Sequence, residues 1–181
     1  MALWGISDAD ESKPKWLNDA DKKKVYADAS GWRFENPKSG ATDEVLCAVS
    51  GLSVSIGSAD ITEIEFISTA FDKSEGGTLS VRVRFNEAVA VTGTPQLTVV
   101  NDQRTNHVLS YASGTGSNEL VFSLVIAAAN AATSAGDVLS IGTNAMALNS
   151  GTVKDNGTST NATITNIAGI GTAAGTITVA A

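Results

Sequence analysis

Cysteine is almost absent from this chain of 181 residues, which contains only Cys47. One cysteine cannot form an internal disulfide or supply the paired thiolates of a cysteine-based zinc site. It lies in an apolar segment without a basic neighbour to activate it, so we expect a buried, unreactive thiol. A chain of this length can nevertheless bury a sizeable core.

Basic residues are also scarce. Lysine and arginine number 12 against 19 acidic residues, which gives a formal net charge of −7. No global basic field attracts nucleic acid, so we expect no nucleic-acid partner. No uninterrupted apolar run approaches the roughly 20 residues that cross a bilayer, so we expect no membrane partner. The start, MALWGISDADESKPKW, lacks the basic and apolar regions of a secretory signal, and we expect no general export.

Recognisable catalytic patterns are missing as well. The chain has one histidine, His107, in a predicted strand, and no Gly-x-Ser-x-Gly elbow. No glycine-rich loop leads into a helix that could hold phosphate. We therefore expect no catalytic residue, no cofactor and no enzyme activity. Calcium is left open as an alternative, because four acidic residues fall in predicted loops: Asp72, Glu75, Asp102 and Asp155.

Charge and tryptophan are concentrated near the N-terminus. Residues 1–50 hold 16 of the 31 charged side chains, and all three tryptophans lie in the first 33 residues. Such a change in composition indicates two parts with a linker near residues 51–60. We therefore predict an arm, residues 1–58, and a body, residues 59–181.

The arm has weak signals for regular structure. Asn18 is a suitable N-cap and Gly31 a suitable C-terminal stop, which together predict one short helix. Its apolar face is thin, so the helix would be marginal in isolation. Residues 44–49 predict a strand that is apolar on both faces, which implies burial; a sheet contributed by something else is one way to bury it. The rest of the arm is expected to be mostly extended.

The body is predicted to be all-β. Residues 78–85 alternate, with Leu79, Val81, Val83 and Phe85 on one face and Ser80, Arg82 and Arg84 on the other. Further strands are predicted at residues 61–68, 96–100, 107–112, 119–126, 137–141, 145–148 and 160–167. Short strands separated by glycine-rich turns favour a β-sandwich.

The C-terminal tail, residues 169–181, is apolar and uncharged. An exposed segment of this kind would promote aggregation. We therefore predict that it pairs as an edge strand, either on its own sandwich or on a neighbouring subunit.

Three runs in the body resemble a known repeat. They are VRVRFNEAVAVTGTPQLTVV, LSYASGTGSNELVFSLVI and LSIGTNAMALNSGTVKDNGTSTNATI, which together cover roughly residues 61–167. In this order they resemble the immunoglobulin-like or cadherin-like repeat of bacterial surface adhesins and phage structural proteins. The resemblance implies an immunoglobulin-like Greek-key β-sandwich used for display, spacing or attachment, without catalytic residues.

The arm carries a second resemblance over about 50 residues. MALWG, SDADESKPKWL and YADASGWRF are similar to the opening of small virion structural proteins from marine T-even-like cyanophages and related myoviruses. Together the two resemblances imply a bacteriophage capsid decoration (cement) protein. Its expected partners are the major capsid protein or other virion subunits. Its expected place is the virion, assembled in the host cytoplasm, as a homo-oligomer or bound to a lattice.

Tryptophan buries a large area and often forms interface contacts in pockets. The expected interface residues of the arm are Trp4, Trp16, Trp32, Tyr26, Val45, Cys47 and Val49. The alternative is that the tryptophans pack together in a small local core. Two other functions stay open: a neck, tail or fibre subunit that binds host-surface glycans, and an adhesive glycan-binding module.

Overall fold

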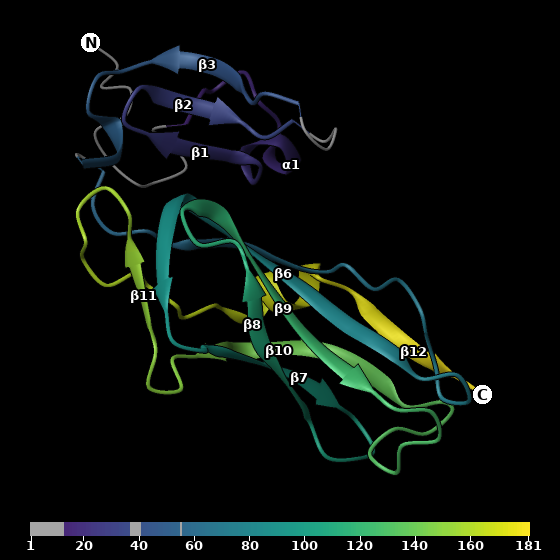
Figure 1. Ribbon diagram of the computed structural model, residues 1–181. Helices are drawn as coiled ribbons and strands as arrows, with labels where there is room; N and C mark the ends of the chain where they lie inside the picture. Colours follow the sequence, from purple (N-terminus) through teal and green to yellow (C-terminus); the bar gives the residue numbers. More distant parts are fainter. Residues whose placement is uncertain (1–12, 37–40, 55) are drawn as a thin grey trace.

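The computed structural model of the chain describes residues 13–36, 41–54 and 56–181. Strands account for 51% of the chain and helices for 8%, so the prediction of a mainly β protein is confirmed. Figure 1 shows the arm as a small unit stacked on one end of an elongated body. In the described ranges, no helix combines the length and the apolar character needed to cross a membrane.

The arm is built from a three-stranded antiparallel meander, in which β2 lies between β1 and β3. Its elements are α1 (Asp19–Lys22), β1 (Val25–Asp28), β2 (Gly31–Phe34), β3 (Glu44–Ala48) and the 3₁₀ helix η2 (Leu52–Val54).

The predicted helix begins as expected but is shorter. The side chain of Asn18 accepts a hydrogen bond from the backbone N–H of Asp21 at 2.9 Å, which confirms the N-cap. The helix ends at Lys22, so the predicted continuation to Gly31 is wrong. Val25 and Tyr26 are β-favouring residues, and they extend into β1 once Val25 can be buried.

A tight turn takes the place of the second half of the predicted helix. Asp28 Oδ1 accepts hydrogen bonds from the backbone N–H groups of Ser30 and Gly31, at 2.7 and 3.0 Å. Gly31 has a φ of 141°, and a Cβ there would lie 2.0 Å from the carbonyl oxygen of Cys47. Only glycine fits both requirements, so the stop that Gly31 predicted is a hairpin turn rather than a helix end.

The arm has a hydrophobic core of its own. Its buried members are Val25, Ala27, Trp32, Leu52 and Ile56. The arm was expected to be mostly extended; instead its strands form a compact unit around these side chains. The physical reason is Trp32, which is fully buried and is the largest side chain in this core.

The body contains nine strands and one short helix within the described residues. They are β4 (Ile61–Phe66), β5 (Phe71–Asp72), β6 (Gly77–Thr92), β7 (Gln96–Asn101), β8 (His107–Ser113), β9 (Ser117–Ile126), β10 (Val138–Ala147), β11 (Thr152–Asp155), α2 (Ala168–Ala173) and β12 (Thr176–Ala180).

The long strand β6 organises this sheet. Its first half pairs antiparallel with β4 and β9, and its second half pairs with β11. From β9 the hydrogen-bonded order continues through β8, β7, β10, β12 and β5. The pairing of β5 with β12 is parallel, so the sheet is mixed.

One large core holds the body together. Strands β4, β6 and β9 contribute to the same buried cluster as β7, β10 and β12, so the sheet is folded over a common interior (Figure 1). In β6 the predicted inward residues are all fully buried: Leu79, Val81, Val83 and Phe85. Period-two alternation therefore identified the core face correctly.

Several boundaries differ from the predicted ones. The strands predicted at residues 137–141 and 145–148 are one irregular strand, β10. Residues 160–167 contain only isolated bridges, so that strand is wrong. Asn166 explains part of this departure, because its amide hydrogen-bonds the backbone of Ala145 and Gly142 at 2.9 Å each. This segment therefore connects elements instead of forming a ladder.

The tail combines a helix and a strand. Its first half forms α2, which the sequence did not predict, because glycine and alanine there carry no clear periodicity. Its second half, β12, pairs with β10 and β5 of the same chain. Of the two alternatives for the tail, pairing on its own chain is the one observed.

Arm and body are in direct contact. The buried cluster of the arm ends at Ile56, and the buried cluster of the body begins at Ala59. A parallel pairing of Ala27 in β1 with Glu87 in β6 joins the two sheets. The division of the chain at residues 58 and 59 stays a prediction.

Candidate functional site: the arm and its joint with the body

The joint between arm and body is centred on two arginines of β6. Arg82 and Arg84 lie on the face of β6 opposite the core, as their alternation predicted. Arg82 remains partly exposed, whereas the side chain of Arg84 is only 5% exposed. A charged side chain on an outward face becomes buried only when another part of the molecule covers it. Here the arm covers it.

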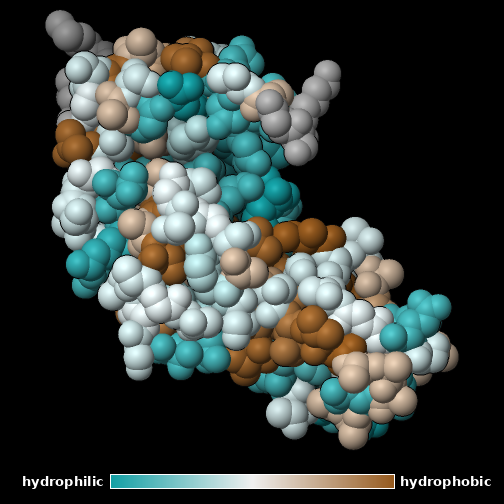
Figure 2. Space-filling model, viewed as in Figure 1, coloured by the Kyte–Doolittle hydropathy of each residue, from teal (hydrophilic) through white to brown (hydrophobic). Residues whose placement is uncertain are grey.

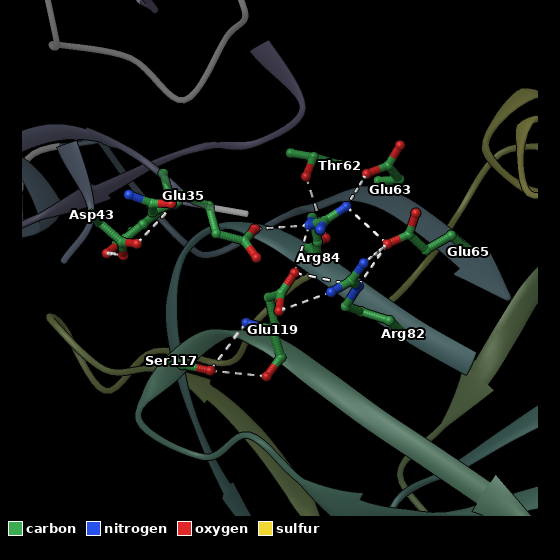
Figure 3. A network of polar contacts seen from close by, with 11 residues as sticks. Glu35, Asp43, Thr62, Glu63, Glu65, Arg82, Arg84, Ser117 and Glu119 are labelled. Atoms are coloured by element: carbon green, nitrogen blue, oxygen red, sulfur yellow. Dashed lines mark hydrogen bonds and ion pairs between the residues drawn. The ribbon is translucent and has the colours of Figure 1, made fainter. Parts of the chain in front are cut away.

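Arg84 binds four carboxylates from three parts of the chain (Figure 3). Its Nε lies 3.0 Å from Glu35 Oε2 and 2.6 Å from Glu119 Oε1. Its Nη1 lies 2.6 Å from Glu63 Oε2 and 3.0 Å from Glu65 Oε1. Glu35 follows β2 in the arm, whereas the other three belong to β4 and β9. One guanidinium thus ties the arm to two strands of the body.

Arg82 completes the network on the solvent side. Its Nε lies 2.6 Å from Glu65 Oε1 and 3.4 Å from Glu119 Oε1. The two arginines therefore face four carboxylates. Lys23 of the arm adds a long contact, with its Nζ 4.0 Å from Glu63 Oε1.

Burial and crowding shift the pKa values of this network. Burial acts to lower the pKa of Arg84, but its hydrogen bond to Glu63 and the nearby charges of Glu119, Glu35 and Glu65 outweigh it. The net pKa is raised, and the guanidinium stays charged. Burial raises the pKa of Glu119; the charge of Arg84 opposes this, and the neighbouring carboxylate of Glu35 adds to it.

A hollow of about 460 Å³ opens beside the network. Every lining side chain is polar or charged: Lys24, Glu35, Asn36, Glu65, Arg82, Arg84 and Glu119. Figure 2 shows hydrophilic surface continuing from the arm across this junction, where the surface is hollowed. Across the described ranges, no group of three histidine, cysteine or acidic side chains is placed to hold a metal ion. The arrangement fixes the arm on the body through ion pairs.

The three tryptophans have different positions. Trp4 lies outside the described residues. Trp16 is 64% exposed. Trp32 is fully buried in the arm core, as the alternative of a local core predicts, and its role at an interface stays a prediction. Sequence alone did not show which of the tryptophans this small unit uses for its own core.

The remaining predicted interface residues gather in β1, β3 and the residue after β3. Tyr26 is half-buried, and its hydroxyl donates a hydrogen bond to Asp43; burial and this carboxylate raise the pKa of Tyr26. Val45 is 50% exposed. Cys47 and Val49 are partly buried against the arm core. The predicted strand is therefore confirmed. Within the described residues β3 is the terminal strand of its sheet, and its burial in a sheet contributed from outside the arm stays a prediction.

Two polar residues considered in the sequence analysis, His107 and Asp155, make contacts within the body. His107 begins β8 and lies 3.5 Å from Thr133 Oγ1, and burial lowers its pKa, with Asp137 opposing the shift. Asp155 is buried and accepts hydrogen bonds from Gly157 and Thr158 in its own turn. Its carboxylate oxygens are thus used inside the fold.

The arginine network was not predicted from the sequence as a site. A signal was present, because Arg82 and Arg84 face outward on β6, and period-two alternation in the predicted strand 61–68 puts Glu63 and Glu65 on one face. Cross-strand pairing of opposite charges would have followed from that pattern. The contribution of Glu35 had no signal, since it depends on how the arm packs.

Comparisons with known proteins add no relative: no protein-family model, no curated protein and no solved structure matches this chain.

Proposed function

We propose that this chain is a bacteriophage virion structural protein, a capsid decoration subunit whose arm docks on the major capsid protein and whose body is displayed outward. The single observation that carries the proposal is where the chain exposes a large aromatic side chain. Within the described residues, the only large aromatic side chain among the exposed apolar ones is Trp16, in the arm. Buried aromatic contacts dominate the energy of many protein interfaces.

The body complements this role as a displayed element. Its exposed large apolar side chains are aliphatic and spread over several strands and loops: Ile67, Val108, Val125, Leu148 and Ile167. Single exposed aliphatic residues are normal for a soluble surface and do not indicate a binding site. We infer that the body is one immunoglobulin-like Greek-key sandwich, as its resemblance implies, and that it acts as a spacer or display unit.

The arginine joint suits a subunit that is held by one end. A contact made by the arm holds the body in a defined orientation only if arm and body do not rotate freely. Arg84 and its four carboxylates resist such rotation, and the pairing of β1 with β6 adds a second connection. Docking of many copies would stabilise the shell by mass action, because bound subunits favour the assembled state.

Binding to particles that lack this subunit tests the proposal. We expect Trp16→Ala to weaken binding of the full chain at least tenfold. Val125→Ala should bind like the wild type, because Val125 is 77% exposed but lies on the body. Equal binding by all three proteins would contradict docking through the arm.

The copy number per particle distinguishes a shell subunit from a neck, tail or fibre subunit. Hundreds of copies, measured by mass spectrometry of purified particles, support a shell subunit. A small multiple of six or twelve, roughly the symmetry of neck and tail, supports the alternative of a neck, tail or fibre subunit. Binding of isolated chain to host glycans, with no binding to particles, supports the adhesive module.

A further inference from the structure

Two carboxyl groups, one from the arm and one from the body, meet at a single N–H group in the joint. The Nε of Arg84 lies 3.0 Å from Glu35 Oε2 and 2.6 Å from Glu119 Oε1. Nε carries one hydrogen, so it cannot give both oxygens a well-aligned hydrogen bond. The two carboxyl groups also lie within hydrogen-bonding reach of each other. Two ionised carboxylates only accept hydrogen bonds, whereas a protonated carboxyl group can donate one to a carboxylate.

Negative charge exceeds positive charge around this pair. Four carboxylates surround two guanidinium groups (Figure 3). Two lysines of the arm compensate only from farther away: Lys23 lies 4.0 Å from Glu63, and Lys24 lines the hollow. In the part of the chain that the structure describes, neither lysine forms an ion pair with Glu35 or Glu119. The charged groups that surround the pair are Arg82 and Arg84 of β6, Glu63 and Glu65 of β4, and Lys23 and Lys24 of the arm.

Water is largely excluded from the pair. The side chains of Glu35 and Glu119 are 20% and 22% exposed. Like charges repel more strongly where water is excluded, and two neighbouring carboxylates then do not both ionise in the ordinary pH range. The pKa of Glu119 accordingly lies above its ordinary value: burial raises it, the charge of Arg84 opposes this, and the charge of Glu35 adds to it. Because the two groups interact, the titration belongs to the pair.

We propose that Glu35 and Glu119 share one proton across the joint, and that this proton stabilises the contact between arm and body. With the proton present, one carboxyl group donates an O–H hydrogen bond to the other, and Arg84 keeps its charge-assisted contacts. Without the proton, Glu35 of the arm and Glu119 of the body repel each other, and only their attraction to Arg84 opposes separation. The joint is therefore tightest at acidic pH and loosens as the pH rises.

The direction of the pH effect follows from proton linkage. When the arm separates from the body, both carboxyl groups enter water and lose each other as neighbours, so the docked pair binds a proton more strongly than the separated pair. The stabilisation is fully present below the ordinary glutamate pKa of about 4.5 and is lost as the pH rises through the raised pKa of the docked pair. His107 acts with the opposite sign, because its pKa is lowered by burial.

This inference goes beyond the proposed function, because it concerns how firmly the body is held on the arm. A tight joint fixes the orientation of the body, and a loose joint lets the body turn. The pH of the surroundings would thus control the freedom of the displayed part. The effect is measured on the isolated chain without particles, so its failure is distinguishable from failure of capsid binding.

Glutamine substitutions in the full chain test the shared proton. Glu119→Gln replaces the carboxyl group by a neutral amide, which can donate a hydrogen bond to Glu35 at every pH. Glu63→Gln is the matched control, because Glu63 also binds Arg84, at 2.6 Å, but is not a member of the pair. Hydrogen exchange of the backbone amides in β1 and β2, corrected for the effect of pH on the intrinsic rate, measures opening of the arm.

We expect opening of the wild-type arm to increase about threefold or more between pH ~5 and pH ~8. Glu119→Gln should abolish this increase and keep the arm as closed as the wild type is at the lower pH. Glu63→Gln should open more at both pH values but retain the increase. No increase in the wild type, an increase retained by Glu119→Gln, or an increase lost in Glu63→Gln would overturn the proposal.

NMR of the side-chain carboxyl carbons gives a second measurement, which does not depend on the glutamine variants of the exchange experiment. In the wild type the signals of Glu35 and Glu119 should titrate together, with at least one apparent pKa above about 4.5. In Glu35→Gln the titration of Glu119 should move to lower pH, because the neighbouring negative charge is gone. Two apparent pKa values below 4.5 in the wild type, or an unchanged titration of Glu119 in Glu35→Gln, would contradict the shared proton.

Discussion

The arm and the body are both small β structures, but they are stabilised on very different scales. Among the described residues, the core of the body collects 22 buried apolar residues from most of its strands, whereas that of the arm collects five. Stability from burial grows with the apolar area removed from water. The body can therefore fold by its own core, while the arm relies on Trp32 and on its joint with the body.

The two parts also differ in what they leave open. In the body, the strands next to solvent are short or accompanied by neighbouring segments. In the arm, β3 is the terminal strand of the described sheet and Trp16 is 64% exposed. Among the described residues, the part with the smaller core thus carries the exposed aromatic side chain. We expect this where one part of a subunit makes contacts and the other provides a stable scaffold.

The largest expected effect is the loss of unfolding free energy when a large aromatic side chain is removed from either core. Phe122→Ala in the body and Trp32→Ala in the arm should each cost about 3–5 kcal/mol, because each leaves a large cavity. Phe122→Ala should lower the main unfolding transition in urea. Trp32→Ala should unfold the arm and leave most of that transition in place.

Limited proteolysis, used together with urea denaturation, shows which part of the chain each variant unfolds. Trp32→Ala should be cut within residues 13–56 while the body resists digestion. Trp32→Phe serves as the control, because it keeps most of the apolar volume. If Trp32→Ala lowers the whole transition as Phe122→Ala does, the arm and body form one cooperative unit.

The next effect concerns the joint. Arg84→Met removes the cation that four carboxylates share, and it should destabilise the chain by about 3 kcal/mol, because it leaves buried charge unpaired. Arg82→Met is the matched control on the same strand. Arg82 is partly exposed, so it should cost about 1 kcal/mol or less.

Proteolysis of the arm shows whether Arg84 acts on the joint. We expect Arg84→Met to speed cleavage between residues 13 and 56 more than Arg82→Met does. Similar losses for both variants would indicate general surface electrostatics and would remove Arg84 from its special role.

A smaller effect is expected from pH at the far end of the body. The pKa of His107 is lowered by burial, so the folded state favours the neutral ring. Its contribution to stability is present above the ordinary pKa of about 6.5 and is lost as pH falls through the lower folded value.

The titration can be followed directly, because His107 is the only histidine. Its ring signals in NMR should give a pKa below 6.5, and His107→Gln should weaken the decrease in unfolding free energy on acidification. Glu119, whose pKa is raised, acts in the opposite sense: its contribution is greatest at low pH and is lost as pH rises. A His107 pKa above 6.5 would contradict the burial of the ring.

The smallest expected effect on stability is that of Trp16→Ala. Trp16 is 64% exposed, so its truncation should change the unfolding free energy by about 0.5 kcal/mol or less. The contrast with Trp32→Ala is the useful result. Two tryptophans of one arm, measured by the same urea titration, should differ several-fold.

Much of the body could be predicted from the sequence because alternation is a local property. The strand at β6 and its inward residues are confirmed, and so are strands at β4, β7, β8 and β9. The missed elements were short or rich in glycine and alanine, such as β5 and α2. Such residues carry no strong period, and contacts with distant strands decide their conformation.

The arm was harder to predict. Its helix was overextended because capping residues were read without the turn that Asp28 builds. The place of β3 at the end of the described sheet had no signal in its sequence, because an apolar strand can be either central or terminal. Of the predicted interface residues, only Trp16 and Val45 are strongly exposed among those described.

The amino-acid sequence by itself determined that the chain is mainly β and which face of β6 forms the core. It also located the change of character near residue 50. Each of these follows from composition or from neighbours along the chain. The tertiary structure decided that Arg84 is buried under the arm, that Trp32 is a core residue and that β3 is the terminal strand of the described sheet. These depend on which segments cover one another, because burial is set by contacts between parts of the chain that are distant in sequence.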